Sequence, residues 1–150
     1  MVYEIAPTVA SMLSLNRAAC EQMLRYDTHG CTDVTGFGLI GHAREMALAS
    51  GVTLEIAADA VQFLPGARDY SARGALPGGL HNNREFAGCD VECAARIPRE
   101  VEHLLYDPQT SGGLLIALPE ADAAALERTL PGAYRVGRAV PRAEKPIRIV

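Results

Sequence analysis

The sequence has no tryptophan and no long apolar run. Its 150 residues include three phenylalanines and five tyrosines. No segment approaches the roughly 20 consecutive apolar residues that a membrane-spanning helix requires. Residues 1–4 lack the basic start of a signal peptide, and no apolar core follows them. These absences predict a cytoplasmic protein with no part in a membrane.

Basic residues are too few and too scattered for a nucleic-acid-binding protein. The chain carries 14 Lys and Arg against 18 Asp and Glu, which gives a formal net charge of -4. A nucleic-acid-binding surface needs a stripe or patch of positive charge to meet the phosphates. The sequence therefore predicts that nucleic acid is not a partner.

Cysteine is scarce as well. The four cysteines are too few for a disulfide scaffold in a chain of this size, and none are spaced as Cys-x-x-Cys. Cys89 and Cys93 could share a face of a helix or strand, but zinc would need two further soft ligands that the sequence does not place. We expect free thiols.

What the chain does have is enough apolar content for one compact domain, since 49% of its residues are hydrophobic and 21% are charged. Residues 1–7 are expected to be extended. Apolar periodicity then predicts one helix capped by Thr8 and ending at His29-Gly30, and a second from residue 37 to a stop at Gly51. The predicted strands are 52–57, 90–94, 114–118, 133–140 and 147–150. Apolar and polar residues alternate along 52–57, so one face of that strand is expected to be exposed to water. They indicate an α/β (α+β) fold with a mixed sheet, because the regular alternation of a doubly wound parallel sheet is missing.

The most informative stretch is residues 31–42, where a short extended run gives way to three glycines and then to a helix. Asp33 offers the hard oxygen ligand that magnesium prefers. Thr35, Gly36 and Phe37 would present unpaired N–H groups and the positive end of the helix dipole to an anion. The pattern favours a metal–phosphate site. The alternative is that Asp33 merely caps the helix.

The same glycines, Gly36, Gly38 and Gly41, match the dinucleotide-binding fingerprint letter for letter. That fingerprint follows a long apolar strand, whereas the preceding residues here are His-Gly-Cys-Thr-Asp. Asp33 would also direct a negative charge at the pyrophosphate. We interpret the match as coincidental.

Two further polar stretches resemble ligand-binding loops. Residues 78–85 crowd two glycines, a histidine and two asparagines at a predicted loop-to-helix junction, which would either line a cleft or form a turn with an Asx-type cap. Residues 107–113 place an acid, two hydroxyls and two glycines before a strand, so backbone can approach a ligand there. Asp107 either contacts that ligand or starts a turn, and His42 is expected to be a structural histidine.

Residues 32–42 and 107–115 together resemble the C-terminal domain of the selenophosphate synthetase (selenide, water dikinase) family. The two motifs stand in the family's order, and the resemblance covers nearly the whole chain. It continues through three further segments: 14–16, 45–46 and 77–83. One departure is Leu80, which stands where the family pattern has a threonine.

The resemblance implies membership of the aminoimidazole ribonucleotide synthetase-like superfamily, whose proteins place an N-terminal ATP-binding domain before an α/β domain and usually dimerise through the former. It implies conversion of ATP, selenide and water to selenophosphate, AMP and phosphate with Mg2+. Residues 8–150 would be the C-terminal domain, 1–7 a remnant of the interdomain linker, and Asp33 the magnesium ligand. The other residues implied at the active-site cleft are Thr35, Gly36, Gly38, Asn83, Thr110, Ser111 and Gly112.

The family's reactive cysteine or selenocysteine and most of its nucleotide site belong to the N-terminal domain, none of which is in this sequence. One carboxylate cannot hold several magnesium ions. We therefore expect the isolated chain to be inactive and to need that domain as its partner, with ATP and selenide as substrates. The alternative is a standalone non-catalytic module of the same fold that binds a protein or a small phosphate ligand.

Overall fold

The computed structural model describes residues 2–150, with side chains described from residue 5 onward. Its helices are α1 (Val2–Leu13), α2 (Arg17–Met23), α3 (Gly38–Ser50), α4 (Ala67–Ala72), α5 (Gly78–Ala87), the 3-10 helix η1 (Gly88–Asp90), α6 (Arg99–Leu105) and α7 (Glu120–Thr129). Its strands are β1 (Gly30–Asp33), β2 (Val52–Ile56), β3 (Val91–Cys93), β4 (Leu114–Ala117), β5 (Gly137–Pro141) and β6 (Ile147–Ile149). Within residues 2–150, no helix combines the length and apolar content needed to cross a membrane.

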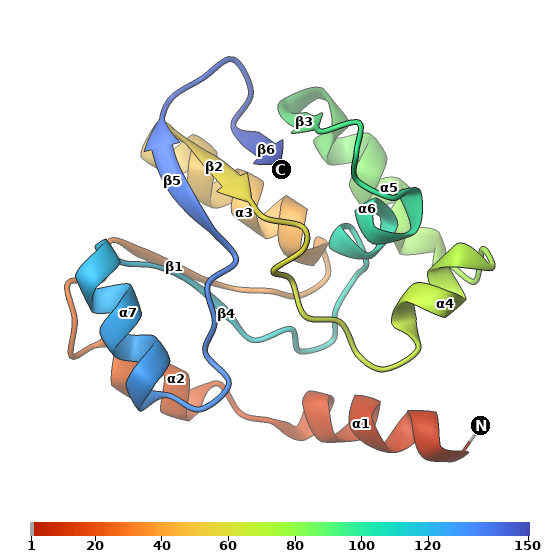
Figure 1. The fold of residues 1–150 in the computed structure, drawn as a ribbon, viewed down its shortest axis with the longest axis horizontal. Helices are drawn as coiled ribbons and strands as arrows, with labels where there is room; N and C mark the ends of the chain where they lie inside the picture. The colour runs from red at the N-terminus through yellow and green to blue at the C-terminus, as the bar shows by residue number, and fades with distance from the viewer. Residues whose placement is uncertain (1) are drawn as a thin grey trace.

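The strands form two sheets (Figure 1). In the four-stranded sheet, of order β3-β6-β2-β5, β6 runs parallel to both β3 and β2, and β5 runs antiparallel to β2. The predicted α/β fold with a mixed sheet is thereby confirmed. The strand predicted at 114–118 is β4, which does not belong to this sheet. It pairs antiparallel with β1, the short extended run before the glycines, in the two-stranded sheet. The strand predicted at 133–140 begins only at Gly137.

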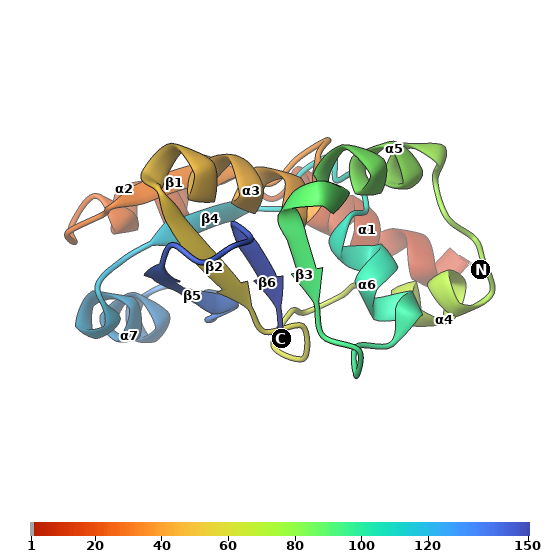
Figure 2. The ribbon, with the colours of Figure 1, turned by 90° about the horizontal axis from the view of Figure 1, so that it is seen from above.

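The hydrophobic core lies between the four-stranded sheet and the helices α3 and α5, which cover one of its faces (Figure 2). Ile40, Ala43 and Ala47 recur at helical spacing on α3 and are fully buried. They pack with Ile147 and Ile149, alternate residues on one face of β6. The helix ends at Gly51, whose left-handed backbone confirms the predicted stop.

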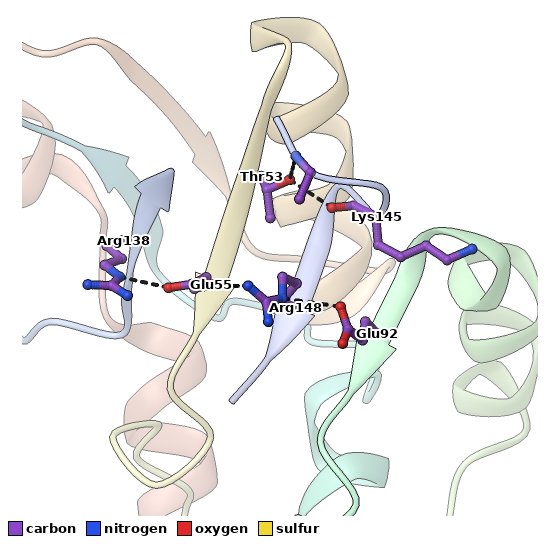
Figure 3. A network of polar contacts seen from close by, with 7 residues as sticks. Thr53, Glu55, Glu92, Arg138, Lys145 and Arg148 are labelled. Carbon is purple, nitrogen blue, oxygen red and sulfur yellow. Dashed lines mark hydrogen bonds and ion pairs between the residues drawn. The ribbon is translucent and has the colours of Figure 1, made fainter. Parts of the chain in front are cut away.

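The opposite face of this sheet carries a row of charges, one residue from each strand (Figure 3). The Glu55 carboxylate on β2 lies 2.7 Å from Arg138 on β5 and 2.9 Å from Arg148 on β6. Arg148 also lies 3.1 Å from Glu92 on β3. These residues face each other because the strands pair in that register.

The prediction that residues 52–57 expose one face to water is wrong for two polar side chains. Glu55 is covered by its two arginines, and Thr53 is completely buried. The Thr53 hydroxyl donates to the Lys145 carbonyl at 2.7 Å and accepts from the Ala143 N–H at 2.9 Å (Figure 3). Alternation of polar and apolar residues indicated a strand correctly, but the chain returning after β5 covers Thr53, and the arginines of the neighbouring strands cover Glu55.

The start of the chain differs from the prediction. Residues 2–7, predicted to be extended, belong to α1, and Met1 lies outside the described residues. Thr8 lies inside α1 instead of capping it, and the single predicted helix is divided by a break at residues 14–16. Gly30, predicted to end that helix, opens β1. Pro7 lies inside α1, beyond the first turn where a helix tolerates proline best, so the proline favoured a later helix start than the structure has.

The polar stretch at residues 78–85 forms most of α5 and is not a loop. Pro77 precedes the helix, and no side chain caps it, so the predicted Asx-type cap is wrong. Leu80, Asn83 and Ala87 are buried at three- and four-residue spacing. Asn83 therefore faces the interior as part of a helix that packs against α3.

Candidate functional site

The two sequence motifs form a single unit, because their backbones are hydrogen-bonded to each other beyond the β1–β4 pair. The Val34 N–H donates to the Gly113 carbonyl at 2.9 Å, and the Gly112 N–H donates back to the Val34 carbonyl at 2.8 Å. Further along, the Gln109 N–H donates to the Thr35 carbonyl at 3.0 Å. Residues 33–38 and 106–113, which we call the paired loops, thus lie side by side although they are far apart in the sequence.

Two glycines make this approach possible. Gly38 has φ +69°, and a Cβ there would lie 2.8 Å from the Tyr106 carbonyl carbon and 2.9 Å from the Asp107 oxygen. A Cβ on Gly112 would lie 2.8 Å from the Val34 oxygen. The glycines of both motifs therefore let backbone meet backbone. The close backbone contact accounts for a glycine at position 38 without a bound dinucleotide. This agrees with the interpretation that the fingerprint match is coincidental.

Asn83 forms a hydrogen bond to each of the paired loops. Its side-chain nitrogen donates to the Gly36 carbonyl at 2.9 Å and to the Tyr106 carbonyl at 3.0 Å, one in each loop. The residue is 9% exposed, so both bonds are largely shielded from water. Since an amide has two N–H donors, both are engaged within the protein. The prediction that Asn83 contacts a ligand stays a prediction, and these two hydrogen bonds make it a positioning residue.

Asp33 lies at the end of β1, where it is exposed and accepts no hydrogen bond on its carboxylate from the described residues. The alternative that it caps the following helix is wrong. Phe37 is the N-cap of α3, no side chain bonds there, and the first turn holds no acid. The helix therefore presents an uncompensated positive end.

The backbone between Asp33 and α3 offers donors. Among the described residues, the N–H groups of Thr35, Gly36 and Phe37 find no hydrogen-bond acceptor, as the sequence predicts. Three unpaired N–H groups beside the start of a 13-residue helix are an environment suited to an anion.

A complete metal site is not present in the part of the chain that the structure describes, where no three His, Cys, Asp or Glu residues gather. Asp33 thus stands as a single hard oxygen ligand, which fits magnesium only if other ligands come from elsewhere. All four cysteines are unpaired, as predicted.

Aromatic side chains flank the first loop. Phe37 and Phe86 stack with ring centroids 6.0 Å apart, and both are more than half exposed. The His42 ring lies 5.5 Å from Phe37, and its Nε2 lies 3.1 Å from the Thr35 hydroxyl oxygen. That contact gives His42 the structural role expected of it. Phe86 lies three residues after Asn83 on α5, and no motif in the sequence marks it as part of the site.

The second loop is more enclosed at its start than at its tip. The Asp107 carboxylate accepts a hydrogen bond from the Gln109 side-chain amide at 2.6 Å, whereas the Gln109 backbone N–H donates to Thr35. Burial raises the pKa of Asp107, and this hydrogen bond opposes the rise. Thr110 is exposed and Ser111 half-buried. The ligand contacts that the resemblance implies for these two residues remain predictions.

Comparison with known proteins matches residues 6–149 to the family described as AIR synthase related protein, C-terminal domain. The chain belongs to this family. As an AIR synthase related C-terminal domain, it is also similar to proteins named selenide, water dikinase. It is 44% identical to the one from Trichlorobacter lovleyi over 99% of its length, and 41% identical to the one from Clostridium botulinum (strain Eklund 17B / Type B) over 96%. It spans only 44% and 43% of those two relatives.

Proposed function

We propose that this AIR synthase related C-terminal domain is the C-terminal part of a selenide, water dikinase. In that role it would take part in converting ATP, selenide and water to selenophosphate, AMP and phosphate. Support comes from the names of its relatives, from their greater length, and from the two motifs joined in the paired loops. An ATP-binding domain, absent from the 150 residues, is the proposed partner, and the full-length protein is proposed to be a homodimer.

The observation that carries the proposal is the exposed Asp33 carboxylate next to three unpaired N–H groups. Asp33 would donate one ligand to Mg2+, which when bound neutralises and orients phosphoryl oxygens. The N–H groups of Thr35, Gly36 and Phe37 would hold an oxygen of the same phosphate, aided by the dipole of α3. Asn83 fixes the loop that carries them.

The isolated chain is proposed to be inactive. Its described residues supply one metal-binding carboxylate. A nucleoside triphosphate bound with several magnesium ions needs more than one such ligand from the protein. The remaining ligands and the nucleophile would come from the ATP-binding domain, across an interface that the paired loops face.

The first prediction tests Asp33 in a reconstituted enzyme. The N-terminal part of the Trichlorobacter lovleyi relative, fused to this chain, should form AMP from ATP only when selenide and Mg2+ are present, and this chain alone should form none. Asp33→Asn should lower that rate at least about 100-fold, because the loss of a metal ligand costs about 3 kcal/mol of transition-state stabilisation.

The matched control is Asp59→Asn, the same change on an exposed acid outside the paired loops. It should retain the full rate. Equal activity in Asp33→Asn and Asp59→Asn would remove the metal role of Asp33. A fusion that folds but never forms AMP would instead favour the non-catalytic module.

A further inference from the structure

A cavity of about 390 Å³ lies among α4, α5 and α6. No residue of the paired loops lines it, so it is separate from the site described above. Helix α4 is joined to α6 at its edge, where the Ser71 hydroxyl donates to the Glu100 carbonyl at 2.8 Å. On α5 the cavity is lined by His81 and Arg84, whose side chains lie on a different side of the helix from Asn83.

His103 on α6 is the unusual residue of this cavity. It is only 8% exposed, and its Nδ1 is the one buried side-chain nitrogen or oxygen among the described residues that has no hydrogen-bond partner. Buried polar groups in native proteins are nearly always paired, so an unpaired one calls for an explanation. A residue that lines a cavity and lacks a partner is suited to meeting a ligand.

The charges around His103 select the kind of ligand. Burial lowers the pKa of His103, and the guanidinium groups of Arg84 and Arg99 lower it further, with a smaller effect of His81 in the same direction. The Glu102 carboxylate opposes them, but it is bound to Arg84 at 2.9 Å. The lowered pKa favours the neutral imidazole, and the guanidinium groups of Arg84 and Arg99 beside it favour an anion over a metal ion as the ligand.

Arg99 is the side chain free to hold that anion. It is exposed, and it forms no ion pair within residues 2–150. The lining includes one acid, Glu100, whose backbone carbonyl accepts the hydrogen bond from Ser71. Leu76 and Ala72 supply apolar surface to the cavity lining.

We propose that this cavity binds a small organic anion, whose oxyanion group is held by Arg99 and the imidazole of His103 and whose apolar part lies against Leu76 and Ala72. A carboxylate and a phosphate ester share this chemistry. The site uses none of the residues assigned to the dikinase reaction, so it stands or falls independently of the proposed function.

The test is a titration of the isotope-labelled chain with inorganic phosphate and, separately, with acetate, at constant ionic strength. NMR resonances of His103, Arg99 and Ser71 should shift and saturate with at least one of the two anions. Saturation by phosphate alone identifies a phosphate ester as the ligand class, and by acetate alone a carboxylate.

Arg99→Ala should weaken that binding at least about 10-fold, which corresponds to about 1.4 kcal/mol. Because Arg99 is exposed, the variant should fold normally. The matched control is Arg96→Ala, which removes the same charge from an exposed residue outside the cavity and should leave the affinity unchanged. Failure of both anions to saturate, or equal affinity in the two variants, would overturn the proposal.

Discussion

At the scale of single residues, the domain uses polar side chains mainly to fix its backbone. Asn83 bonds one carbonyl in each of the paired loops, and Thr53 bonds two backbone groups of the segment that follows β5. Each is buried, so its loss would leave polar backbone atoms without partners in a place that water reaches poorly.

Asn83→Ala is expected to reduce the free energy of unfolding by about 2–3 kcal/mol, since two carbonyls lose their donor. The neighbouring Asn82→Ala is the control, because Asn82 is exposed on the same helix and should change stability by less than about 0.5 kcal/mol. Urea unfolding followed by circular dichroism measures both. Equal stability of the two variants would contradict the role given to Asn83.

His103 makes stability depend on pH. Its pKa is lowered in the folded state, chiefly by burial, so the folded protein binds a proton less readily than the unfolded chain, whose histidine titrates near 6.5. Stability is therefore retained above about pH 6.5 and lost as pH falls below it, until the lowered pKa of the folded state is passed.

The measurement is the free energy of unfolding at about pH 7.5 and about pH 5.5, on either side of the unfolded-state pKa, for the natural chain and for His103→Gln. Other groups that titrate in this range contribute to both proteins, so the difference between the two pH slopes reports His103. The variant should lose less stability on acidification. A slope as steep as that of the natural chain would show that His103 does not titrate in this way.

At the scale of elements, the domain is joined by pairings between distant segments. The β1–β4 pair brings the two motifs together, and the row of charges from Arg138 to Glu92 links four strands across the open face of the larger sheet. In both cases strand register decides which side chains and backbone groups meet.

The junction of the paired loops depends on Gly38. Gly38→Ala combines a left-handed backbone with a Cβ that would lie under 3.0 Å from backbone of the other loop, so we expect a loss of about 3 kcal/mol or more. Gly36→Ala, two residues earlier, meets no heavy atom within 4 Å and should cost less than about 1 kcal/mol. Thermal unfolding of both variants checks this, and a Gly38→Ala protein as stable as Gly36→Ala would show that the loops can separate.

At the scale of the whole molecule, one helix stands apart. In Figure 1, α1 runs along the edge of the molecule away from the four-stranded sheet. Ile5, Val9 and Met12 recur at helical spacing on it and are 62%, 40% and 42% exposed. Such an apolar stripe is typical of an interaction surface. Under the proposed function, the ATP-binding domain would be the partner that covers it.

Replacing Ile5, Val9 and Met12 together with serine should leave the stability of this chain nearly unchanged and weaken its association with the separately expressed N-terminal part of the Trichlorobacter lovleyi relative at least about 10-fold. Leu24, Leu48 and Leu64 are also exposed but scattered, and their replacement with serine is the control. Calorimetric titration measures both affinities. Equal loss of affinity in the two triple variants would show that the stripe on α1 is not the docking surface.

Local pattern in the sequence determined the fold class, most element positions and the identity of both motifs. Periodicity and glycine stops are local properties, so α3 and its end at Gly51 were predictable, as were the unpaired N–H groups between Asp33 and the helix. The buried Asn83 had a readable signal too, since it follows Leu80 at helical spacing, but its polar neighbours suggested a loop.

Only the tertiary structure decided how distant segments meet. The pairing of β4 with β1, the two carbonyls that Asn83 bonds, and the position of His103 near Arg84 all depend on contacts between residues far apart in the chain. Such contacts are set by register and packing of the complete domain, which the order of residues within any one segment does not specify.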